Sequence, residues 1–481
     1  MSSRKFNEYK GLDLPQLGRE VLEVWDRENT FGRSITEREG APAFIFYEGP
    51  PSANGLPGIH HVLSRTIKDT ICRYKTQQGY LVRRKAGWDT HGLPVELGVE
   101  KKLGITKEDI GHKISIEEYN RTCREAVMEF TGVWEELTRK MGYWVDMKHP
   151  YITYENKYIE TLWWMLKQLF DKGLLYKGYT IQPYSPAAGT GLSNHELNQP
   201  GCYRDVKDTT CTAQFEIIRD ERSEFLFDDA QGTLYFLAWT TTPWTLPSNT
   251  ALAVGDNIEY VRVKCLNPYT QQPQTVILAK ELLPAYFTPK MEGTYSIGER
   301  IYKGSELVGI RYRQLIDWVK PMGDAFRVIS GDYVTTVDGT GIVHIAPTFG
   351  ADDDRVGKQA GIVPMYVVDR AGKNQPMVDR RGRLFRIEDM DPDFVAKYVD
   401  AERYREWAGR FVKNAYDPSL GPDDPTLDID IAVMLKGEGK AFKIEKHTHS
   451  YPHCWRTDKP VLYYPLDSWF IRTTALRERL M

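Results

Sequence analysis

The sequence predicts an α/β fold in which a parallel-sheet domain carries a large, mostly β insertion. An apolar run at 44–47, a helical period over 62–74 and a second strand-like stretch at 79–86 follow one another in the order of a βαβ unit. From about residue 181, short β-branched and aromatic runs alternate with turn residues, which is typical of a β-rich domain. With 481 residues, 41% of them hydrophobic, the chain is too long for one ordinary domain, so we expect two or three.

Composition limits which partners the protein can bind and in which cellular compartment we expect it. The formal net charge is −3, so a nucleic-acid partner would have to bind local basic patches instead of the field of the whole molecule. The six cysteines include no CxxC pair and the N-terminus lacks the apolar run of a secretory signal, which favours a reduced, cytoplasmic setting. No window approaches the roughly eighteen consecutive apolar residues of a membrane span, so we expect no membrane role.

The first predicted strand ends in a loop, "GPPSANGLPGIHH" at 49–61, that is rich in glycine and proline. Glycines let the backbone approach a ligand closely, and prolines hold the loop so that it needs no ordering on binding. His60 and His61 stand where the next helix begins, and a helix N-terminus favours an anion such as a phosphate. Imidazoles there can donate hydrogen bonds to a phosphate in a transition state. The alternative is that both histidines are only a helix cap or a surface feature.

The second predicted strand ends in another polar loop, at 87–94. In a parallel sheet both loops lie beyond the carboxyl ends of the strands, where ligands bind. Two helical stretches are expected in the outer layer of this domain. The first opens with a capping-box pattern at Ser115 and Glu118 and carries an apolar stripe that extends to Met141, and the second spans about 155–170. The first stripe indicates core packing rather than a cofactor site, and the second helix repeats its pattern.

Two segments of the β-rich region carry side chains that can take part in binding or catalysis. The segment "WTTTPWTLPSN", at 239–249, places consecutive hydroxyl groups at the end of a strand-forming run. The segment "GIVHIAPTFGADDD", at 341–354, places His344 nine positions before Asp353. Taken alone, the threonine run is equally well explained by the preference of threonine for β-strands.

The loop at 49–61, followed by "GWDTHGLPVE", closely resembles the nucleotide-binding half of the class I aminoacyl-tRNA synthetases, and within them the isoleucyl enzymes. The resemblance implies a Rossmann-type domain whose His-Ile-Gly-His signature falls here on 58–61, with its first and third letters replaced. It places His61 on the ATP phosphates, whereas His60 can substitute for the missing first imidazole only if the loop shifts. The residues implied for ATP are Gly58, His60 and His61, of which the two histidines are catalytic. The residues implied for isoleucine are Gly49, Pro50, Asp89 and Trp469, with Asp89 on the ammonium group.

The threonine segment and the segment at 341–354 together resemble the editing domain of isoleucyl-, valyl- and leucyl-tRNA synthetases, in its isoleucyl form. An apolar pocket distinguishes isoleucine from valine by one methylene, worth only about 1–3 kcal/mol, and enzymes of this class are the usual illustration of that limit. A second, smaller pocket would remove the wrong product with an oriented water, and the resemblance places Asp353 on the amino group of that product. The editing residues that it implies are Thr240, Thr241, Thr242, Thr245, Asn249, His344 and Asp353.

The resemblance also implies a domain organisation and a reaction. The expected domains are an N-terminal helical extension (1–42), the first half of the Rossmann catalytic domain (43–180), the inserted editing domain (181–446) and a truncated return into the catalytic domain (447–481). The implied reaction is activation of isoleucine by ATP with Mg²⁺, through attack of the carboxylate on the α-phosphate, and transfer to tRNA(Ile). Mischarged valyl products would be hydrolysed. We expect a monomer.

Some features depart from the family or leave alternatives open. Many relatives bind zinc through CxxC pairs at the base of the insertion, but only Cys454 remains at the matching places, so we expect no structural zinc. The second ATP signature, Lys-Met-Ser-Lys-Ser, does not occur, so we expect poor activation by this chain. A stand-alone deacylase of mischarged tRNA and a non-catalytic tRNA-binding fragment are the alternatives. Arg380, Arg381, Arg383 and Arg386 form either a basic cluster for the acceptor end of tRNA or a solvated turn.

Overall fold

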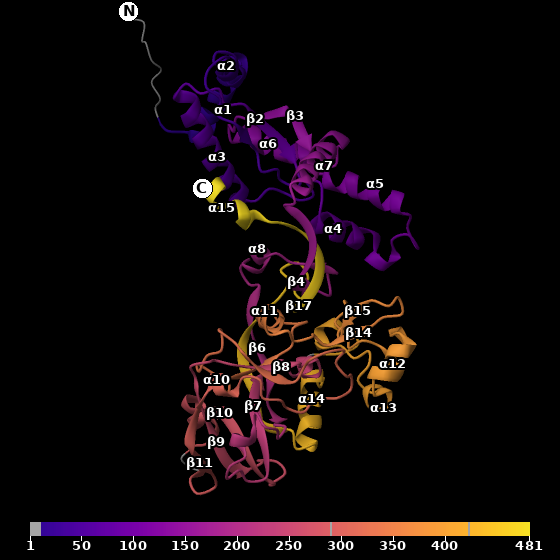
Figure 1. Ribbon diagram of the computed structural model, residues 1–481. Coiled ribbons are helices and arrows are strands. Elements are labelled where there is room, and N and C mark those ends of the chain that lie inside the picture. Colours follow the sequence, from indigo (N-terminus) through magenta and orange to yellow (C-terminus); the bar gives the residue numbers. More distant parts are fainter. Residues whose placement is uncertain (1–10, 289–290, 422–423) are drawn as a thin grey trace, which may run out of the picture. The chain divides into compact units, whose positions relative to one another are not determined.

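The structure is a computed structural model that describes residues 11–288, 291–421 and 424–481. Its contacts divide the chain into two compact units (Figure 1). The first unit contains the described residues up to Tyr176 together with Ile471–Met481, and the second is Lys177–Phe470. The β-rich unit therefore continues beyond residue 446 to Phe470.

A small parallel sheet lies at the centre of the first unit. Its strands, in spatial order, are β1 (Phe46–Tyr47), β2 (Arg84–Trp88) and β3 (Asp146–Ile152). Phe46 pairs with Arg84 and Gly87 pairs with Tyr151, both in parallel register. Helix α3 (Ile59–Gln77) connects β1 to β2, so the predicted βαβ unit is confirmed.

The other elements of the first unit are helical. They are α1 (Leu14–Arg27), α2 (Thr30–Thr36), α4 (Leu93–Leu103), η1 (Lys107–Asp109), α5 (Ile116–Val127), α6 (Thr131–Lys140), α7 (Asn156–Asp171), η8 (Thr473–Leu476) and α15 (Arg477–Leu480). Helix α5 begins as predicted, since Ser115 Oγ accepts from the Glu118 N–H at 3.1 Å. The helical stretch predicted to Met141 is interrupted, because the N–H of Phe130 donates to the Ala53 carbonyl at 3.0 Å instead of continuing α5.

The predicted apolar stripes differ in how far they are buried. Val127 and Trp134 are buried, and Trp134 packs against Ala53 of the 49–61 loop and Trp88 of β2. Helix α7 confirms the helix predicted at about 155–170, but none of its residues is buried. The stripe of α5 and α6 therefore supports the loop, whereas that of α7 stays accessible.

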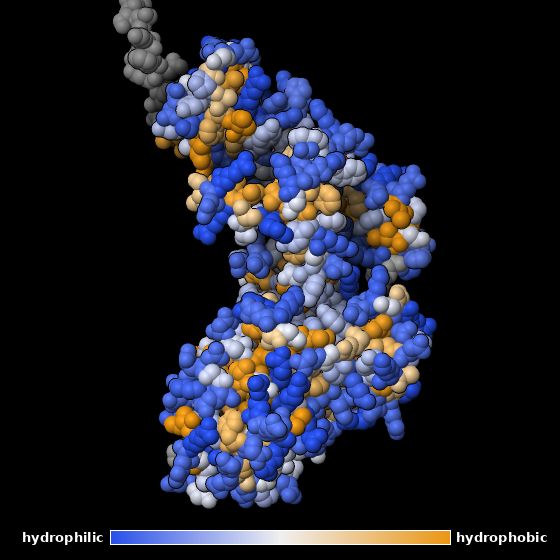
Figure 2. Space-filling view, viewed as in Figure 1, coloured by the Kyte–Doolittle hydropathy of each residue, from blue (hydrophilic) through white to orange (hydrophobic). Residues whose placement is uncertain are grey.

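Helix α3 buries charged side chains. The Asp69 carboxylate accepts from Arg84 Nη1 of β2 at 2.9 Å and from Arg73 Nε at 2.7 Å. Leu63 and Ile67 are each more than half exposed. Figure 2 shows apolar residues, in orange, at several other places on the surface as well. The apolar period of this segment thus predicted a helix correctly without marking its buried face.

A mixed sheet forms the core of the second unit. Nine strands belong to it within the described residues: β6 (Tyr203–Glu216), β7 (Thr233–Thr240), β8 (Ala251–Val254), β9 (Glu259–Leu266), β10 (Pro273–Ala279), β11 (Ser296–Lys303), β12 (Arg327–Ser330), β13 (Ile342–Ile345) and β16 (Ala441–Pro452). The main path runs β11-β9-β10-β7-β13-β8-β12, while β6 pairs with β7 and β16 pairs with β6. The predicted α/β class with a mostly β second region is confirmed. The predicted boundary at 446 falls inside β16, which stays paired with β6 to Pro452.

Smaller elements complete the second unit. A second sheet has the order β17-β4-β5, and β14 pairs with β15. The strands are β4 (Leu175–Ser185), β5 (Thr190–Gly191), β14 (Tyr366–Val368), β15 (Asn374–Pro376) and β17 (Leu462–Ile471). The helices are α8 (Asn194–Leu197), η2 (Glu224–Leu226), η3 (Pro243–Ser248), η4 (Lys280–Leu282), α9 (Leu283–Tyr286), α10 (Gly304–Leu307), α11 (Ala351–Ala360), η6 (Ile387–Asp389), α12 (Pro392–Tyr398), α13 (Ala401–Tyr404), η7 (Asn414–Tyr416) and α14 (Leu427–Gly437). Phe236 of β7, Ile277 of β10 and Ile431 of α14 belong to one buried cluster.

We expect Gly232→Ala to destabilise the protein more than Gly361→Ala. Both glycines have positive φ, +62° and +71°, which disfavours a side chain by roughly 1 kcal/mol. A Cβ at Gly232 would lie 1.9 Å from the carbonyl oxygen of Pro273, whereas a Cβ at Gly361 meets no described atom within 4 Å. Urea unfolding of both variants measures the difference. Equal losses of unfolding free energy would show that the close approach at Gly232 is absent.

Candidate functional site

A cavity of about 310 Å³ lies in the second unit, where β7 ends beside β13. Thr240 is the last residue of β7, and the following threonines lie in the turn and in η3. The predicted editing residues that line this cavity are Thr240, Thr241, Thr242, Thr245, His344 and Asp353. The threonine run is therefore at the end of the strand, where its hydroxyl groups face a space that a ligand can enter.

Asn249 lies behind the cavity wall and holds His344. The Thr245 hydroxyl donates to the Thr242 carbonyl at 2.8 Å, so its oxygen is left to accept from His344 Nε2, also at 2.8 Å. Asn249 Nδ2 lies 3.3 Å from His344 Nδ1 and donates to it. The Asn249 carbonyl oxygen in turn accepts from the buried Tyr312 hydroxyl at 2.7 Å. These contacts define a neutral imidazole with its proton on Nε2.

The protonation of His344 limits what it can do. Burial lowers the pKa of His344 to about 4. At neutral pH the ring is uncharged, and both of its nitrogens already have hydrogen-bond partners within the protein. His344 therefore shapes and fixes the wall of the cavity, and a general base would need a free nitrogen.

Asp353 supplies a negative charge to the same cavity. It lies in the first turn of α11, where its Oδ2 accepts from the Ala346 N–H at 2.8 Å and its Oδ1 accepts from the Tyr333 hydroxyl at 3.3 Å. Burial raises the pKa of Asp353 to about 6, and these two hydrogen bonds oppose that rise. Above that pH the carboxylate is ionised and faces the cavity, so it can bind a cation such as an ammonium group.

Some wall residues were not predicted from the sequence. Tyr333, which orients Asp353, and Phe349 line the cavity, as do Gly339 and Gly341. Gly341 has a φ of +72°, and a Cβ there would lie 2.4 Å from Ala279 Cβ. The glycine pair in "DGTGI" is a sequence signal that could have marked this close approach. Tyr333 has no such signal, because it lies in an irregular loop.

The candidate residues of the first unit meet at the ends of β1 and β2. Gly49 and Pro50 follow β1, and Asp89 directly follows β2. The N–H of Asp89 donates to the Pro51 carbonyl at 3.0 Å, which joins the two loops. A carboxylate and a glycine–proline turn therefore lie side by side at the carboxyl ends of neighbouring parallel strands.

His60 and His61 lie at the beginning of α3. Gly58 is the residue before the helix, and its N–H donates to His61 Nδ1 at 2.9 Å. The two imidazole rings are 3.8 Å apart, and a Cβ at Gly58 would lie 2.8 Å from His60 Cε1. The His60 ring thus occupies the space that a Cβ atom at position 58 would need. Burial, and next the neighbouring His60, lower the pKa of His61.

Hydrogen bonds to α6 fix the loop that precedes α3. Trp134 Nε1 donates to the Gly55 carbonyl at 2.9 Å, and the Phe130 N–H donates to the Ala53 carbonyl. The His61 ring lies edge-on to Trp134, with 4.8 Å between the ring centroids. The loop and the first histidines of α3 are therefore held before any ligand binds.

Trp469 belongs to a different unit from the other residues implied for isoleucine. It is on β17 in the second unit and 62% exposed, whereas Gly49, Pro50 and Asp89 belong to the first unit. The structure describes Trp469 only within its own unit, so its predicted contact with isoleucine stays a prediction.

The predicted arginine cluster is partly neutralised by neighbouring acids. Arg383 Nη2 lies 2.7 Å from Asp379, and Arg386 Nε lies 3.5 Å from Asp389. Paired arginines offer less charge to a phosphate backbone, which favours the interpretation of this segment as a charged turn.

The described residues contain neither a metal-binding cluster nor a membrane-spanning helix. No cluster of three or more histidine, cysteine, aspartate or glutamate side chains in this part of the chain is arranged to hold a metal ion. No described helix is both long enough and apolar enough to cross a bilayer.

Residues 20–481 match the family described as tRNA synthetases class I (I, L, M and V), so the chain belongs to this family. Three of the curated relatives that it matches are isoleucine–tRNA ligases. The protein of that name from Bacteroides fragilis is 64% identical over 492 residues, which cover 100% of this chain and 43% of the relative. That from Porphyromonas gingivalis is 63% identical over the same shares of the two chains. The isoleucine–tRNA ligase from Clostridium tetani is 43% identical over 477 residues, which cover 98% of this chain and 40% of the relative.

The chain thus spans about 43% of the length of its Bacteroides fragilis relative. A solved structure titled "The crystal structure of GlLeuRS-CP1" matches 50% of this chain and 99% of its own at 14% identity, with a TM-score of 0.32. The fold of the second unit is defined by the strand pairings given above.

We expect the His344 imidazole to remain neutral, with its proton on Nε2, at pH 5.5. NMR of ¹⁵N-histidine-labelled protein, with His344→Gln to identify the signal, measures both properties. An unfolded imidazole takes up a proton near pH 6.5, but folded His344 does so only near pH 4. Its contribution to stability is therefore full above pH 6.5 and is lost as the pH falls toward 4. A cationic ring at pH 5.5 would contradict the hydrogen-bond arrangement.

Proposed function

We propose that this chain is the activating and editing part of an isoleucine–tRNA ligase, and that its second unit hydrolyses tRNA mischarged with valine. The observation that supports editing is the cavity in which the threonine hydroxyls and the Asp353 carboxylate meet. The printed names of the relatives support isoleucine as the amino acid and tRNA(Ile) as its acceptor.

In the proposed editing reaction, Asp353 binds the ammonium group of the misacylated product through a charge-assisted contact. The walls formed by Thr241, Thr242 and His344 admit the side chain of valine and exclude the additional methylene of isoleucine. Both His344 nitrogens have partners in the protein, so no side-chain base is assigned. Water, oriented by the threonine hydroxyls and the terminal ribose, attacks the ester carbonyl and releases valine and tRNA.

In the proposed activation reaction, the loop at 49–58 and the N-terminus of α3 bind the phosphates of ATP, which carries Mg²⁺. The fit rests on Gly49, whose backbone is exposed, and on a helix terminus that favours anions. His61 donates to a phosphate. His60, whose ring covers Gly58, stands in for the imidazole that the family signature has at position 58. Asp89 holds the ammonium group of isoleucine while the isoleucine carboxylate attacks the α-phosphate, which breaks the α–β phosphoanhydride bond and releases pyrophosphate.

The 481-residue chain should release valine from valyl-tRNA(Ile) much faster than isoleucine from isoleucyl-tRNA(Ile). Asp353→Asn should lower kcat/KM for valine release by on the order of 10- to 100-fold, since a hydrogen bond to a charged group contributes about 1.5–3 kcal/mol. Release of radiolabelled amino acid over time measures both rates.

Asp354→Asn is the matched control for this experiment. Asp354 is the next residue of α11, but its carboxylate accepts from Lys358 Nζ at 2.6 Å. We expect this variant to keep the rate of the unmodified chain. Equal release rates for valine and isoleucine, or equal losses of kcat/KM in both variants, would contradict the editing proposal.

Asp89→Asn should abolish most of the stabilisation that isoleucine gives to the folded chain. A ligand that binds the folded state raises the unfolding temperature, and loss of the charged contact weakens binding by about 1.5–3 kcal/mol. Thermal unfolding with and without saturating isoleucine measures the effect. Valine release should not change, because Asp89 belongs to the first unit and the editing cavity to the second. If both properties fell together, Asp89 would be a structural residue.

A further inference from the structure

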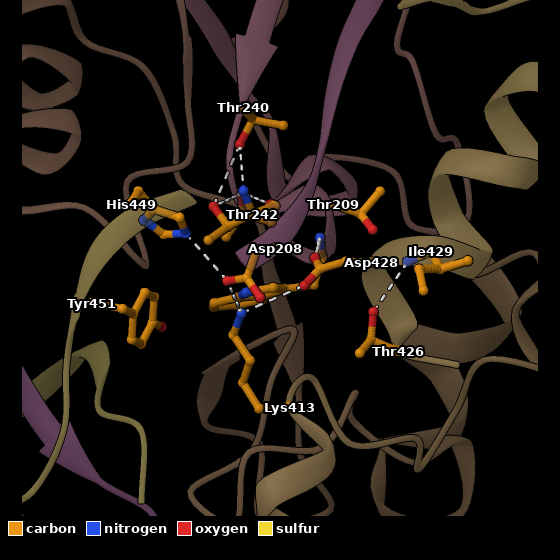
Figure 3. A network of polar contacts seen from close by, with 12 residues as sticks. Asp208, Thr209, Thr240, Thr242, Lys413, Thr426, Asp428, Ile429, His449 and Tyr451 are labelled. Atoms are coloured by element: carbon orange, nitrogen blue, oxygen red, sulfur yellow. Dashed lines mark hydrogen bonds and ion pairs between the residues drawn. The ribbon is translucent and has the colours of Figure 1, made fainter. Parts of the chain in front are cut away.

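A buried network of charges lies beside the editing cavity and takes no part in the proposed chemistry (Figure 3). Lys413 Nζ is 3.0 Å from Asp208 Oδ2 and 3.5 Å from Asp428 Oδ2. The side chains of Lys413 and Asp428 are only 10% and 2% exposed. His449 Nε2 of β16 approaches the same Asp208 oxygen at 3.2 Å. Buried ion pairs contribute little net stability because desolvation opposes them, so their position needs another explanation.

A hydrogen bond to the backbone connects the network to the cavity wall. Asp428 Oδ1 accepts from the N–H of Trp244 at 2.9 Å. Trp244 is the second residue of η3, between Thr242 and Thr245 of the cavity wall. Its indole ring packs edge-on against Phe349 of the same wall, with 5.0 Å between centroids. Displacement of Trp244 would therefore move both sides of the cavity.

The turn that carries these threonines needs such an anchor. The first N–H groups of a helix have no partner within the helix, and η3 contains two prolines, Pro243 and Pro247, which cannot donate at all. Asp428, in the first turn of α14, provides an acceptor from outside. Burial raises the pKa of Asp428 to about 6, and Lys413 is the first group that opposes this rise. Above that pH the acceptor is a carboxylate, which binds an N–H more strongly than a neutral group does.

Lys413 is itself attached to the long β-ribbon of the second unit. Asp208 belongs to β6 and His449 to β16, so the ammonium group is held against both strands. It also lies 4.9 Å from the centroid of the Tyr451 ring, which favours a cation. The anchor of the turn is therefore fixed to the sheet and not to a loop.

We propose that Asp428 and Lys413 are positioning residues of the editing site, which hold η3 where Thr242 and Thr245 form the cavity wall. The proposal rests on the editing function proposed above. Neither residue lines the cavity, and neither is among the residues that the family resemblance implies. They would act on hydrolysis by fixing the hydroxyl groups that orient the water.

The test compares variants of Asp428 in the 481-residue chain. Asp428→Ala removes the acceptor, so kcat for valine release should fall by on the order of tenfold while KM changes less than about twofold. Asp428→Asn retains a carbonyl oxygen for the Trp244 N–H and should recover most of the rate. Asp430→Ala is the matched control on the same helix, since Asp430 pairs with Arg410, and should leave kcat unchanged. Asp428→Leu, which fills the space without an acceptor, replaces the alanine variant if that one does not fold.

Amide hydrogen exchange over 240–249 gives a second readout that needs no catalysis. Exchange in this segment should be faster in Asp428→Ala than in Asp430→Ala, and close to that of the unmodified chain in Asp428→Asn. An alanine or leucine variant of Asp428 with the kcat and the exchange of the control would overturn the proposal. If the unmodified chain released no valine, the editing function itself would fail, and the exchange data alone would decide whether Asp428 anchors the turn.

Discussion

The pairing of β7 with β13 is the contact on which the editing cavity depends. These strands are parallel, with Val343 opposite Trp239, so the end of β7 at Thr240 lies beside His344, which is 104 positions further along the chain. The next turn then brings Thr245 to within 2.8 Å of the histidine ring. Strand pairing, a backbone property, thereby decides which side chains meet, and the side chains add the chemistry.

In both units, buried ion pairs fix an element that carries residues of a candidate site. In the first, the Asp69 carboxylate joins α3 to β2 through Arg84, which fixes the helix whose N-terminus carries the two histidines. In the second, Lys413 and Asp428 hold a turn next to the cavity. Such pairs add little to the net free energy of folding, but their geometry is demanding, so they favour one arrangement of the chain over its alternatives.

The histidines at the two sites share a physical character. Burial is the main reason why the pKa of both His61 and His344 is lowered, so that both rings are neutral near pH 7. A neutral ring has one donor and one acceptor, and in each case one nitrogen is committed to the protein by a hydrogen bond from Gly58 or Asn249. His61 has Nε2 left for a ligand, whereas His344 uses both nitrogens within the protein. This difference separates a residue that can contact phosphate from one that shapes a wall.

The sequence by itself determined the α/β class, the βαβ unit and the helix that begins near His60 and His61, because apolar periods and glycine–proline loops are local features, and a family resemblance singled out the two segments whose residues meet in the cavity. It did not determine which face of α3 is buried, since Asp69 pairs with an arginine of β2 that only the tertiary structure brings near. Nor did it indicate Tyr333, or Asp428, whose partners lie 20 and 184 residues away along the chain. Those contacts depend on which strands and helices pack together, and a one-dimensional pattern carries no information about neighbours that are distant in the chain.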